Sequence, residues 1–304
     1  MNSPLPLSLP DDLSTAQAIQ KRLLPHDNLT FGDLQFKAYY RPFRSIGGDY
    51  YDFVPLDRNR LGFAIGDVSG KGVGAALIMA SLQASLRARL LDQGTKPSTL
   101  IRSLSQLLYE CSLPNVYATL FYGEFNAEMR VLTYVNAGHN PPLVLRQEKD
   151  RVRILRLESE GPPVGAFPDA VYQSRRCALQ PYDLLVAYTD GITETSNQVQ
   201  EHWGAARLEA ILSTCIGKRP AEIIAAILKA LESFAGPVVV GDDMTLVVAT
   251  VEQSLTTCAP RQTRYADTTP VEMASEVAAS PSTGVFSSLT RRRGALVSRP
   301  QTAY

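Results

Sequence analysis

Two helical stretches follow one another in this chain, with strands before and after them. Val73–Leu91 carries apolar residues on nearly all sides, which is typical of a largely buried helix. A second helix is predicted from Pro97, with Leu100, Leu104 and Leu108 at helical spacing. Because two consecutive helices break the alternation of strand and helix, this order of elements predicts an α+β layered fold.

The other elements follow from periodicity and turn residues. A helix is expected at Asp12–Leu24, with Asp12 as its N-cap and Pro25 ending it. Two more helices are expected at Ala205–Leu212 and Pro220–Phe234. Strands are predicted at Gly32–Pro42, Tyr50–Leu56, Leu61–Asp67, Tyr117–Phe125, Val131–Asn136, Leu143–Leu145, Val152–Leu157, Val171–Leu179, Leu184–Tyr188 and Met244–Val251.

These elements occupy one predicted domain, residues 12–252. Residues 1–11 are rich in proline, and residues 253–304 are rich in Ser, Thr and Pro with an Arg triplet at Arg291–Arg293. Such compositions cannot bury enough surface to offset the entropy of ordering, so both ends are predicted to be disordered. The chain as a whole is 45% hydrophobic, which is ample for a core.

Charge and cysteine content narrow the functional classes. Lys plus Arg and Asp plus Glu each number 30 among the 304 residues, so no charge bias points to nucleic acid or to an anionic membrane. No apolar run approaches the roughly 20 residues that span a bilayer, and the N-terminus lacks the pattern of a secretory signal. A cytoplasmic protein is expected. Neither a zinc site nor a disulfide framework is indicated by the four dispersed cysteines, Cys111, Cys177, Cys215 and Cys258.

The stretch Ser45–Leu77 contains two aspartates, Asp49 and Asp67, each directly after a glycine. A strand pattern lies between them, and a glycine-rich turn and a helix follow Asp67. A carboxylate at a strand end beside such a turn is well placed to hold a hard cation. A plain hairpin with a glycine-rich turn accounts for this stretch alone nearly as well.

Downstream aspartates favour the cation. Asp190 and the pair Asp242 and Asp243 also stand at predicted strand edges beside glycine. Gathered together, these carboxylates would repel one another unless a cation neutralised them. Carboxylate ligands without His or Cys suit Mg²⁺ or Mn²⁺ rather than zinc. Two such ions can ionise a water and hold a phosphoryl group, which is a hydrolytic phosphatase mechanism without a protein nucleophile.

Eight motifs carry a family resemblance over about residues 16–250. The chain resembles the SpoIIE/RsbU-type serine/threonine phosphatases of the PPM (protein phosphatase 2C-like) superfamily. The motifs, in order, are IQKRLLP (Ile19–Pro25), SIGGDYYDF (Ser45–Phe53), IGDVSGKGVGAALIMA (Ile65–Ala80), ATLFYGEF (Ala118–Phe125), YVNAGHNPPL (Tyr134–Leu143), GPPVGAF (Gly161–Phe167), YTDGITE (Tyr188–Glu194) and GDDMTLVV (Gly241–Val248).

The resemblance implies a four-layer α/β/β/α sandwich, in which helices flank two central antiparallel sheets. It also implies a site for two Mn²⁺ or Mg²⁺ ions. By motif, Asp67 would bridge both ions with the Val68 carbonyl nearby, and Asp49 would support one ion. Asp190 and Asp242 would hold the other. Asp67 and Asp49 are thus the predicted catalytic residues.

The resemblance further implies a substrate and a pathway. The family dephosphorylates phosphoserine or phosphothreonine on a STAS-type anti-sigma factor antagonist, and so regulates sigma factors by partner switching in bacteria. Helix Asp12–Leu24 resembles the segment that couples a regulatory region to the catalytic domain and can self-associate, although a helix that only packs on the flank of the domain fits the sequence equally well. No nucleic-acid or membrane partner is implied.

Some positions depart from the family pattern or leave alternatives open. Ser69 stands where the eukaryotic branch has a histidine that acts as general acid, so the group that protonates the leaving oxygen is not identified. Asp243 is a weaker ligand candidate than Asp242. Arg44 and Lys71 lie near the predicted site and are candidate phosphate contacts, or else solvated surface charges.

Two other functional classes remain open. The domain could dock a partner without turnover, as a catalytically silent phosphatase-like module, although all four carboxylate positions are filled. It could also hydrolyse a small phosphoester rather than a phosphoprotein. His139 in NAGHNPP is an acid–base candidate or, by its loop context, a hydrogen-bonding turn residue.

Overall fold

The computed structural model describes residues 9–92, 94–159, 161–236 and 241–252. The predicted disorder of residues 1–8 and 253–304 lies outside the described residues. The first helix, α1, runs from Leu9 to Leu23. The prediction of disorder for residues 9–11 is therefore wrong, and Asp12 lies inside the helix instead of capping it.

Two antiparallel sheets form the centre of the fold. The six-stranded sheet has the order β1-β2-β11-β10-β7-β8, and the five-stranded sheet has the order β3-β4-β5-β6-β9. The strands are β1 Asn28–Phe31, β2 Leu34–Arg41, β3 Tyr50–Pro55, β4 Arg60–Val68, β5 Ala118–Asn126, β6 Val131–Ala137, β7 Leu143–Glu148, β8 Arg151–Arg156, β9 Arg175–Ala178, β10 Leu184–Tyr188 and β11 Met244–Val251.

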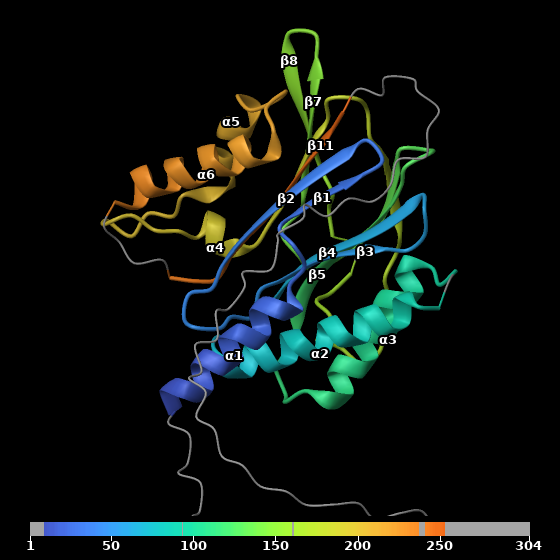
Figure 1. Ribbon diagram of the computed structural model, residues 1–304, viewed down its shortest axis with the longest axis vertical. Coiled ribbons are helices and arrows are strands. Elements are labelled where there is room, and N and C mark those ends of the chain that lie inside the picture. The colour runs from blue at the N-terminus through green and yellow to red at the C-terminus, as the bar shows by residue number, and fades with distance from the viewer. Residues whose placement is uncertain (1–8, 93, 160, 237–240, 253–304) are drawn as a thin grey trace, which may run out of the picture. The chain divides into compact units, whose positions relative to one another are not determined.

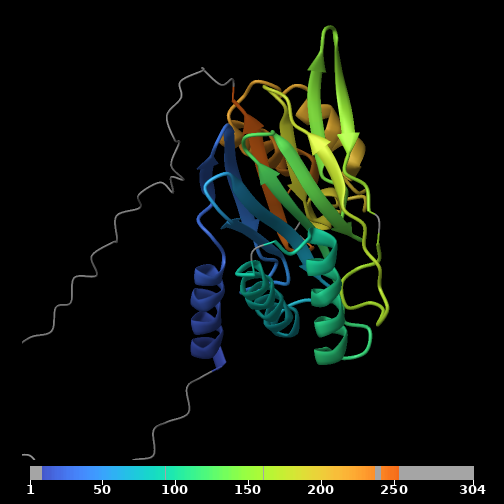
Figure 2. The same ribbon diagram turned by 90° about the vertical axis from the view of Figure 1, so that its right-hand side faces the viewer.

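Helices cover the outer face of each sheet. One apolar cluster joins the five-stranded sheet to α2 (Val73–Leu90) and α3 (Pro97–Cys111). Another joins the six-stranded sheet to α5 (Gly204–Ser213) and α6 (Pro220–Ala235). Figure 1 shows the two helix pairs on separate sides of the strands, and Figure 2 shows α1, α2 and α3 together. The predicted four-layer sandwich is confirmed.

The alternation of side chains along each strand explains the layers. In β4, Leu61, Phe63 and Ile65 point into the cluster between the sheets, whereas Ala64 and Val68 point toward α2. The neighbours Tyr50 and Tyr51 of β3 likewise enter different clusters, and both are buried. The sequence of a strand that is buried on both faces is therefore almost continuously apolar.

Several predicted elements differ from the observed ones. The strand predicted at Gly32–Pro42 corresponds to β2, and its partner β1 was not predicted. Gly32 lies in the turn between them with a φ of 58°. The strand predicted at Val171–Leu179 is reduced to Arg175–Ala178. A short helix, α4 (Asp190–Thr193), was not predicted.

Helix α2 is less buried than its sequence predicts. Val73 is 52% exposed and Leu77 is 67% exposed, while the opposite face of the helix enters the core. In the described part of the chain, no helix combines the length and the apolar composition needed to cross a bilayer.

Candidate metal centre

The predicted ligands come from two places in the fold, one in each sheet. In the five-stranded sheet, Tyr50 at the start of β3 pairs with Gly66 near the end of β4, so Asp49 and Asp67 flank one sheet edge. In the six-stranded sheet, Tyr188 at the end of β10 pairs with Leu246 near the start of β11. Antiparallel pairing thus brings the segments that carry Asp190 and Asp242 together as well.

Asp49 joins these two halves. Its side chain is buried, and its Oδ2 accepts hydrogen bonds from the Thr189 hydroxyl at 2.8 Å and the Thr245 hydroxyl at 2.5 Å. The Thr245 amide also donates to the Thr189 hydroxyl oxygen at 2.9 Å. Because Thr245 belongs to β11 and Thr189 directly follows β10, the Asp49 carboxylate joins the start of β3 to the six-stranded sheet.

Two glycines allow the loops to approach this closely. A side-chain carbon on Gly48 would lie 2.9 Å from the carbonyl oxygen of Val68. A side-chain carbon on Gly191, beside Asp190, would lie 1.9 Å from the carbonyl oxygen of Asp243. Backbone contacts of this kind exclude any larger residue, so glycine at positions 48 and 191 has a packing cause.

The carboxylates perturb one another. Burial, followed by the negative charges of Asp190 and Asp242, raises the pKa of Asp67 to about 8. Burial and the neighbouring charge of Asp67 raise the pKa of Asp49 well above its ordinary value, against the two threonine hydroxyls. Burial also raises the pKa of Asp190, and the charges of Glu194 and Asp242 add to it. Without a cation, this group of acids favours protonation.

Lys71 provides one positive charge within the group. Its ammonium lies 2.6 Å from Oδ2 of Asp242 and 2.7 Å from the carbonyl oxygen of Gly241. The predicted phosphate contact is therefore ion-paired. Arg44, the other predicted contact, lies 5.7 Å from the centre of the Phe43 ring and forms no ion pair among the described residues.

Asp243 has a different task from Asp242. Its carboxylate is buried and accepts hydrogen bonds from the backbone amides of Phe43 and Gly48, each at 2.7 Å. It holds the loop that leads into Asp49. These contacts agree with its ranking below Asp242 as a candidate metal ligand.

The chemistry of this donor set fits Mg²⁺ or Mn²⁺. All candidate donors are carboxylate or carbonyl oxygens, and the acids carry too much negative charge for a buried group that lacks a cation. As the side chains stand, no three His, Cys, Asp or Glu residues of the described ranges converge tightly enough to enclose an ion. Asp242 is turned toward Lys71 instead, so metal binding would require that ion pair to open.

His139 lies in the core near this centre and not in a solvated loop. It is 3% exposed, its backbone amide donates to Asn136 at 2.8 Å, and its Nδ1 lies 2.9 Å from the Thr119 hydroxyl. Burial lowers the pKa of His139 to about 4, against a smaller opposing effect of the Tyr188 carbonyl. A neutral, hydrogen-bonded histidine matches the turn role better than the acid–base role.

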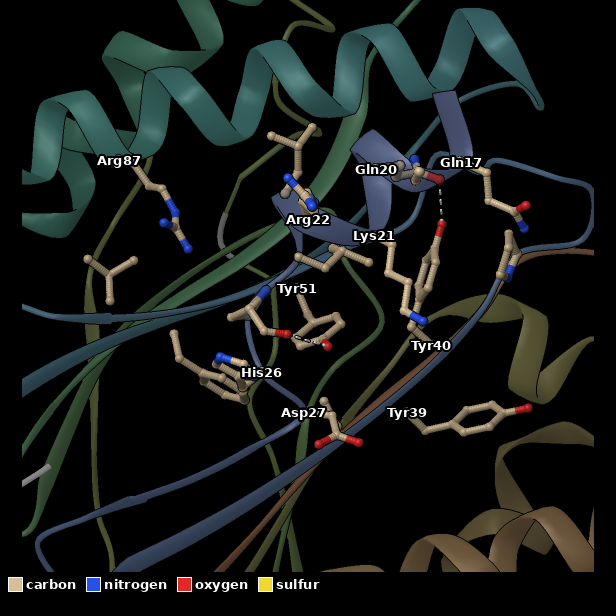
Figure 3. Close-up of a pocket in the computed structure, with 18 of the residues that line it drawn as sticks. Gln17, Gln20, Lys21, Arg22, His26, Asp27, Tyr39, Tyr40, Tyr51 and Arg87 are labelled. Atoms are coloured by element: carbon tan, nitrogen blue, oxygen red, sulfur yellow. Dashed lines mark hydrogen bonds between the residues drawn. The ribbon is translucent and has the colours of Figure 1, made fainter. Parts of the chain in front are cut away.

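Helix α1 reaches the same loop through Gln20. The Gln20 side chain donates to the Gly47 carbonyl at 2.7 Å and accepts from the Gly47 amide at 3.1 Å. The Tyr40 hydroxyl donates to the same side chain at 3.1 Å (Figure 3). Because Gly47 stands two residues before Asp49, α1 is attached to the loop of the candidate site and not only to the flank of the domain.

A cavity of about 1180 Å³ lies beneath α1, away from the carboxylates. Figure 3 shows its lining of side chains from α1, β2 and β3, with Arg87 of α2 at one side. None of the predicted metal ligands lines it. The cavity is therefore separate from the candidate centre.

Sequence reasoning gave no role to Thr189, Thr245 or Gln20. Each stands inside one of the motifs of the sequence. Thr189 directly precedes Asp190, Thr245 follows Asp242 by three residues, and Gln20 lies near the end of α1. A hydroxyl next to an aspartate was an available signal, but the partner of each hydroxyl lies more than a hundred residues away.

Comparisons with known proteins agree with this architecture. A family model described as stage II sporulation protein E (SpoIIE) matches residues 57–252. Protein IcfG of Synechocystis is 30% identical over 267 residues, which cover 78% of this chain and 41% of that protein. Phosphoserine phosphatase RsbU of Bacillus subtilis is 31% identical over 183 residues, which cover 60% of this chain and 53% of that protein. The chain thus spans about half the length of these curated relatives.

Solved structures support the fold. The SiaA-PP2C domain of Pseudomonas aeruginosa matches with a TM-score of 0.67 and 18% identity, covering 81% of this chain and 97% of that one. The PP2C phosphatase domain of SpoIIE from Bacillus subtilis matches with a TM-score of 0.61 and 20% identity, covering 72% and 63%. At these identities the likeness shows the fold alone.

Proposed function

This chain belongs to the SpoIIE family, and on that premise we propose that it is a metal-dependent phosphatase of phosphoserine or phosphothreonine side chains. One observation carries the proposal. Asp49 accepts hydrogen bonds from Thr189, which precedes Asp190, and from Thr245, three residues after Asp242, so the segments that carry the candidate ligands are joined. A group of buried acids that raise one another's pKa suits a pair of divalent cations better than it suits a purely structural cluster.

The chain's own residues take distinct parts in this proposal. Asp67 would contact both ions, Asp49 and the Val68 carbonyl would complete one side, and Asp190 with Asp242 would hold the other. The threonine hydroxyls keep the Asp49 carboxylate in a fixed orientation. When bound, Mn²⁺ or Mg²⁺ ions would supply an activated water and neutralise the phosphoryl oxygens.

Two basic side chains, Lys71 and Arg44, lie beside the acidic group. Lys71 is paired with Asp242, and Arg44 has no ion pair in the described residues. A guanidinium can hold phosphoryl oxygens in a bidentate manner, so Arg44 is the better placed of the two to receive the substrate's phosphate. Lys71 would join it once Asp242 turns toward an ion.

The substrate is proposed from the relatives. RsbU and RsbP of Bacillus subtilis are named phosphoserine phosphatases. A phosphorylated STAS-type anti-sigma factor antagonist is therefore the first protein substrate to test, in a partner-switching pathway. The attachment of Gln20 to Gly47 favours α1 as the element through which a regulatory partner or a second copy of the chain acts.

Metal-dependent turnover tests the proposal. The purified chain is expected to hydrolyse p-nitrophenyl phosphate and a phosphorylated STAS protein with Mn²⁺, and chelation is expected to abolish both activities. Asp67→Asn should lose at least about a thousandfold in kcat/KM, as expected when a ligand shared by two ions is lost. Asp150→Asn, an exposed loop residue, is the matched control.

The alternatives give different results. Binding of the phosphoprotein without any Mn²⁺-dependent turnover would identify a silent binding module and refute the enzyme. Efficient cleavage of small esters with no cleavage of phosphoproteins would favour the small-phosphoester hydrolase. Capture of phosphoproteins on Asp190→Asn, followed by mapping of the phosphorylated position, would identify the natural substrate.

A further inference from the structure

Helix α2 carries an apolar face that nothing in the described structure covers. Val73 and Leu77 are 52% and 67% exposed and lie four residues apart, so they share one face of the helix. Ala75, Met79, Leu82 and Leu86 point to the opposite side, into the core. The exposed pair is therefore not an edge of the core but a separate surface.

Gly74 lies beside this pair and has no structural reason to be glycine. Its backbone is not in the left-handed region, and a side-chain carbon built on it would meet no atom within 4 Å. Gly74 is the second residue of α2, so the full helix-interior cost of glycine does not apply to it. Neither backbone strain nor packing against the described residues requires a glycine here, and the missing side chain leaves the backbone open to the close approach of another molecule.

The apolar face is continuous with the candidate metal centre. Lys71, which contacts Asp242, stands two residues before Val73. An Nη1 atom of Arg44 lies 4.0 Å from the position that a side-chain carbon on Gly72 would take. The unpaired guanidinium and the apolar face thus adjoin each other at the first turn of α2.

We propose that Val73, Gly74 and Leu77 form the docking surface for the polypeptide that carries the phosphorylated serine or threonine. Its occupant is an extended segment with apolar side chains close to the phosphorylated residue. This inference rests on the proposed phosphatase function and adds to it the sequence context that the site selects. The phosphate pairs with Arg44, the segment's backbone crosses Gly74, and an apolar side chain covers Leu77.

Dimensions agree with this assignment. From Val73 to Leu77 the helix rises about 6 Å. An extended chain spans about 10 Å in three residues. Apolar residues within about three positions of the phosphorylated residue can therefore reach Leu77 while the phosphate remains beside Arg44.

The test compares three substrates on the full chain with Mn²⁺. One is p-nitrophenyl phosphate. The other two are phosphoserine peptides that differ only within about three positions of the phosphoserine, with Leu and Val in the apolar peptide and Ser and Gly in the polar peptide. The wild-type chain is expected to prefer the apolar peptide about tenfold in kcat/KM, a typical effect of burying a well-packed apolar contact. The double variant Val73→Thr/Leu77→Gln should reduce that preference to about one.

Gly74→Gln provides a second variant with effects of opposite sign. Because glutamine is a better helix former than glycine, the melting temperature should rise by a few degrees. The same side chain should obstruct the peptide backbone and lower kcat/KM for both peptides relative to p-nitrophenyl phosphate. Met129→Gln is the matched control, since Met129 is 59% exposed in the turn between β5 and β6.

Peptide binding separates this inference from the proposed function. Fluorescence anisotropy with Asp67→Asn chain reports docking without turnover. Tighter binding of the apolar peptide that depends on Leu77 supports the surface even if no substrate is hydrolysed, a result that would refute the phosphatase alone. Equal binding and equal use of the two peptides would overturn the docking surface. An unchanged peptide preference in the double variant would overturn it as well. If sedimentation also showed that the wild-type chain forms a dimer and the double variant does not, the face would belong to a second copy.

Discussion

The ammonium group of Lys71 lies 2.6 Å from Oδ2 of Asp242, within a group of aspartates that otherwise repel one another. Lys71 lies in the loop between β4 and α2, and Asp242 lies in the loop before β11. The contact therefore joins a loop of the five-stranded sheet to a loop of the six-stranded sheet. The side chain neutralises the carboxylate that the second half of the candidate metal centre needs. Ion and ammonium therefore compete for Asp242.

Replacement of Lys71 should strengthen metal binding. In Lys71→Met, Asp242 is released and the centre loses one positive charge, so Mn²⁺ affinity should increase about two- to fivefold, the scale of a partly exposed ion pair. Isothermal titration calorimetry measures it. Lys37→Met, which removes a comparable pair with Asp27 at 2.7 Å, should leave the affinity unchanged. A loss of Mn²⁺ affinity in Lys71→Met would contradict the competition between Lys71 and the ion for Asp242.

The adjacent aspartates should separate stability from metal binding. Asp243→Ala leaves the buried amides of Phe43 and Gly48 without their acceptor, which should lower the free energy of unfolding by about 2–4 kcal/mol. Asp242→Asn should change it by less than about 0.5 kcal/mol and weaken Mn²⁺ binding at least tenfold. Urea denaturation and calorimetry measure the two quantities. Reversed outcomes would exchange the roles of these residues.

The threonine hydroxyls should matter through Asp49. Thr245→Val removes a donor to a buried carboxylate, so the pKa of Asp49, already raised, should rise further and Mn²⁺ binding should weaken. The loss of this buried hydrogen bond should also lower stability by about 1–3 kcal/mol. Thr245→Ser keeps the hydroxyl and serves as the control. If Thr245→Ser and Thr245→Val behaved alike, the hydroxyl would have no such role.

His139 should make the fold sensitive to mild acid. Its pKa is lowered to about 4 from an ordinary 6.5, so the unfolded chain binds a proton in this interval and the folded chain does not. The contribution to stability is thus present above pH 6.5 and is lost as the pH falls toward 4, by roughly 3 kcal/mol in all. Denaturation of His139→Gln at several pH values should show a flatter profile between pH 4 and 6.5. A slope equal to that of the wild-type chain would exclude His139 as its source.

Local sequence determined the elements whose signals are local. Pro97 began its helix where predicted, and Leu184–Tyr188 and Met244–Val251 were placed at the residues where the strands lie. Strand β1 (Asn28–Phe31) was not predicted, because four residues give little alternation of polar and apolar side chains. Helix α1 begins before Asp12 although that residue is a favourable cap, since proline and leucine are acceptable in a first turn.

The order of motifs indicated which residues form the candidate centre, but not how their side chains are used. The family pattern ranked Asp242 above Asp243 as a ligand, but only the position of the Phe43 and Gly48 amides gives Asp243 a structural task. Likewise, apolar residues on nearly all sides predicted a buried α2. A sequence pattern reports the chemistry of each helix face, but not whether another part of the protein covers that face. The exposure of Val73 and Leu77 appears only in the packed structure.

By itself, the sequence determined the layered α+β architecture and the aspartates beside glycine, because strand alternation, helix spacing and turn chemistry act within a few residues. The tertiary structure alone decided that Asp49 is held by Thr189 and Thr245 and that Lys71 neutralises Asp242. These contacts join residues 140 to 196 positions apart. Their formation depends on how two sheets pack, and packing is fixed by the burial of the whole core and not by any local pattern.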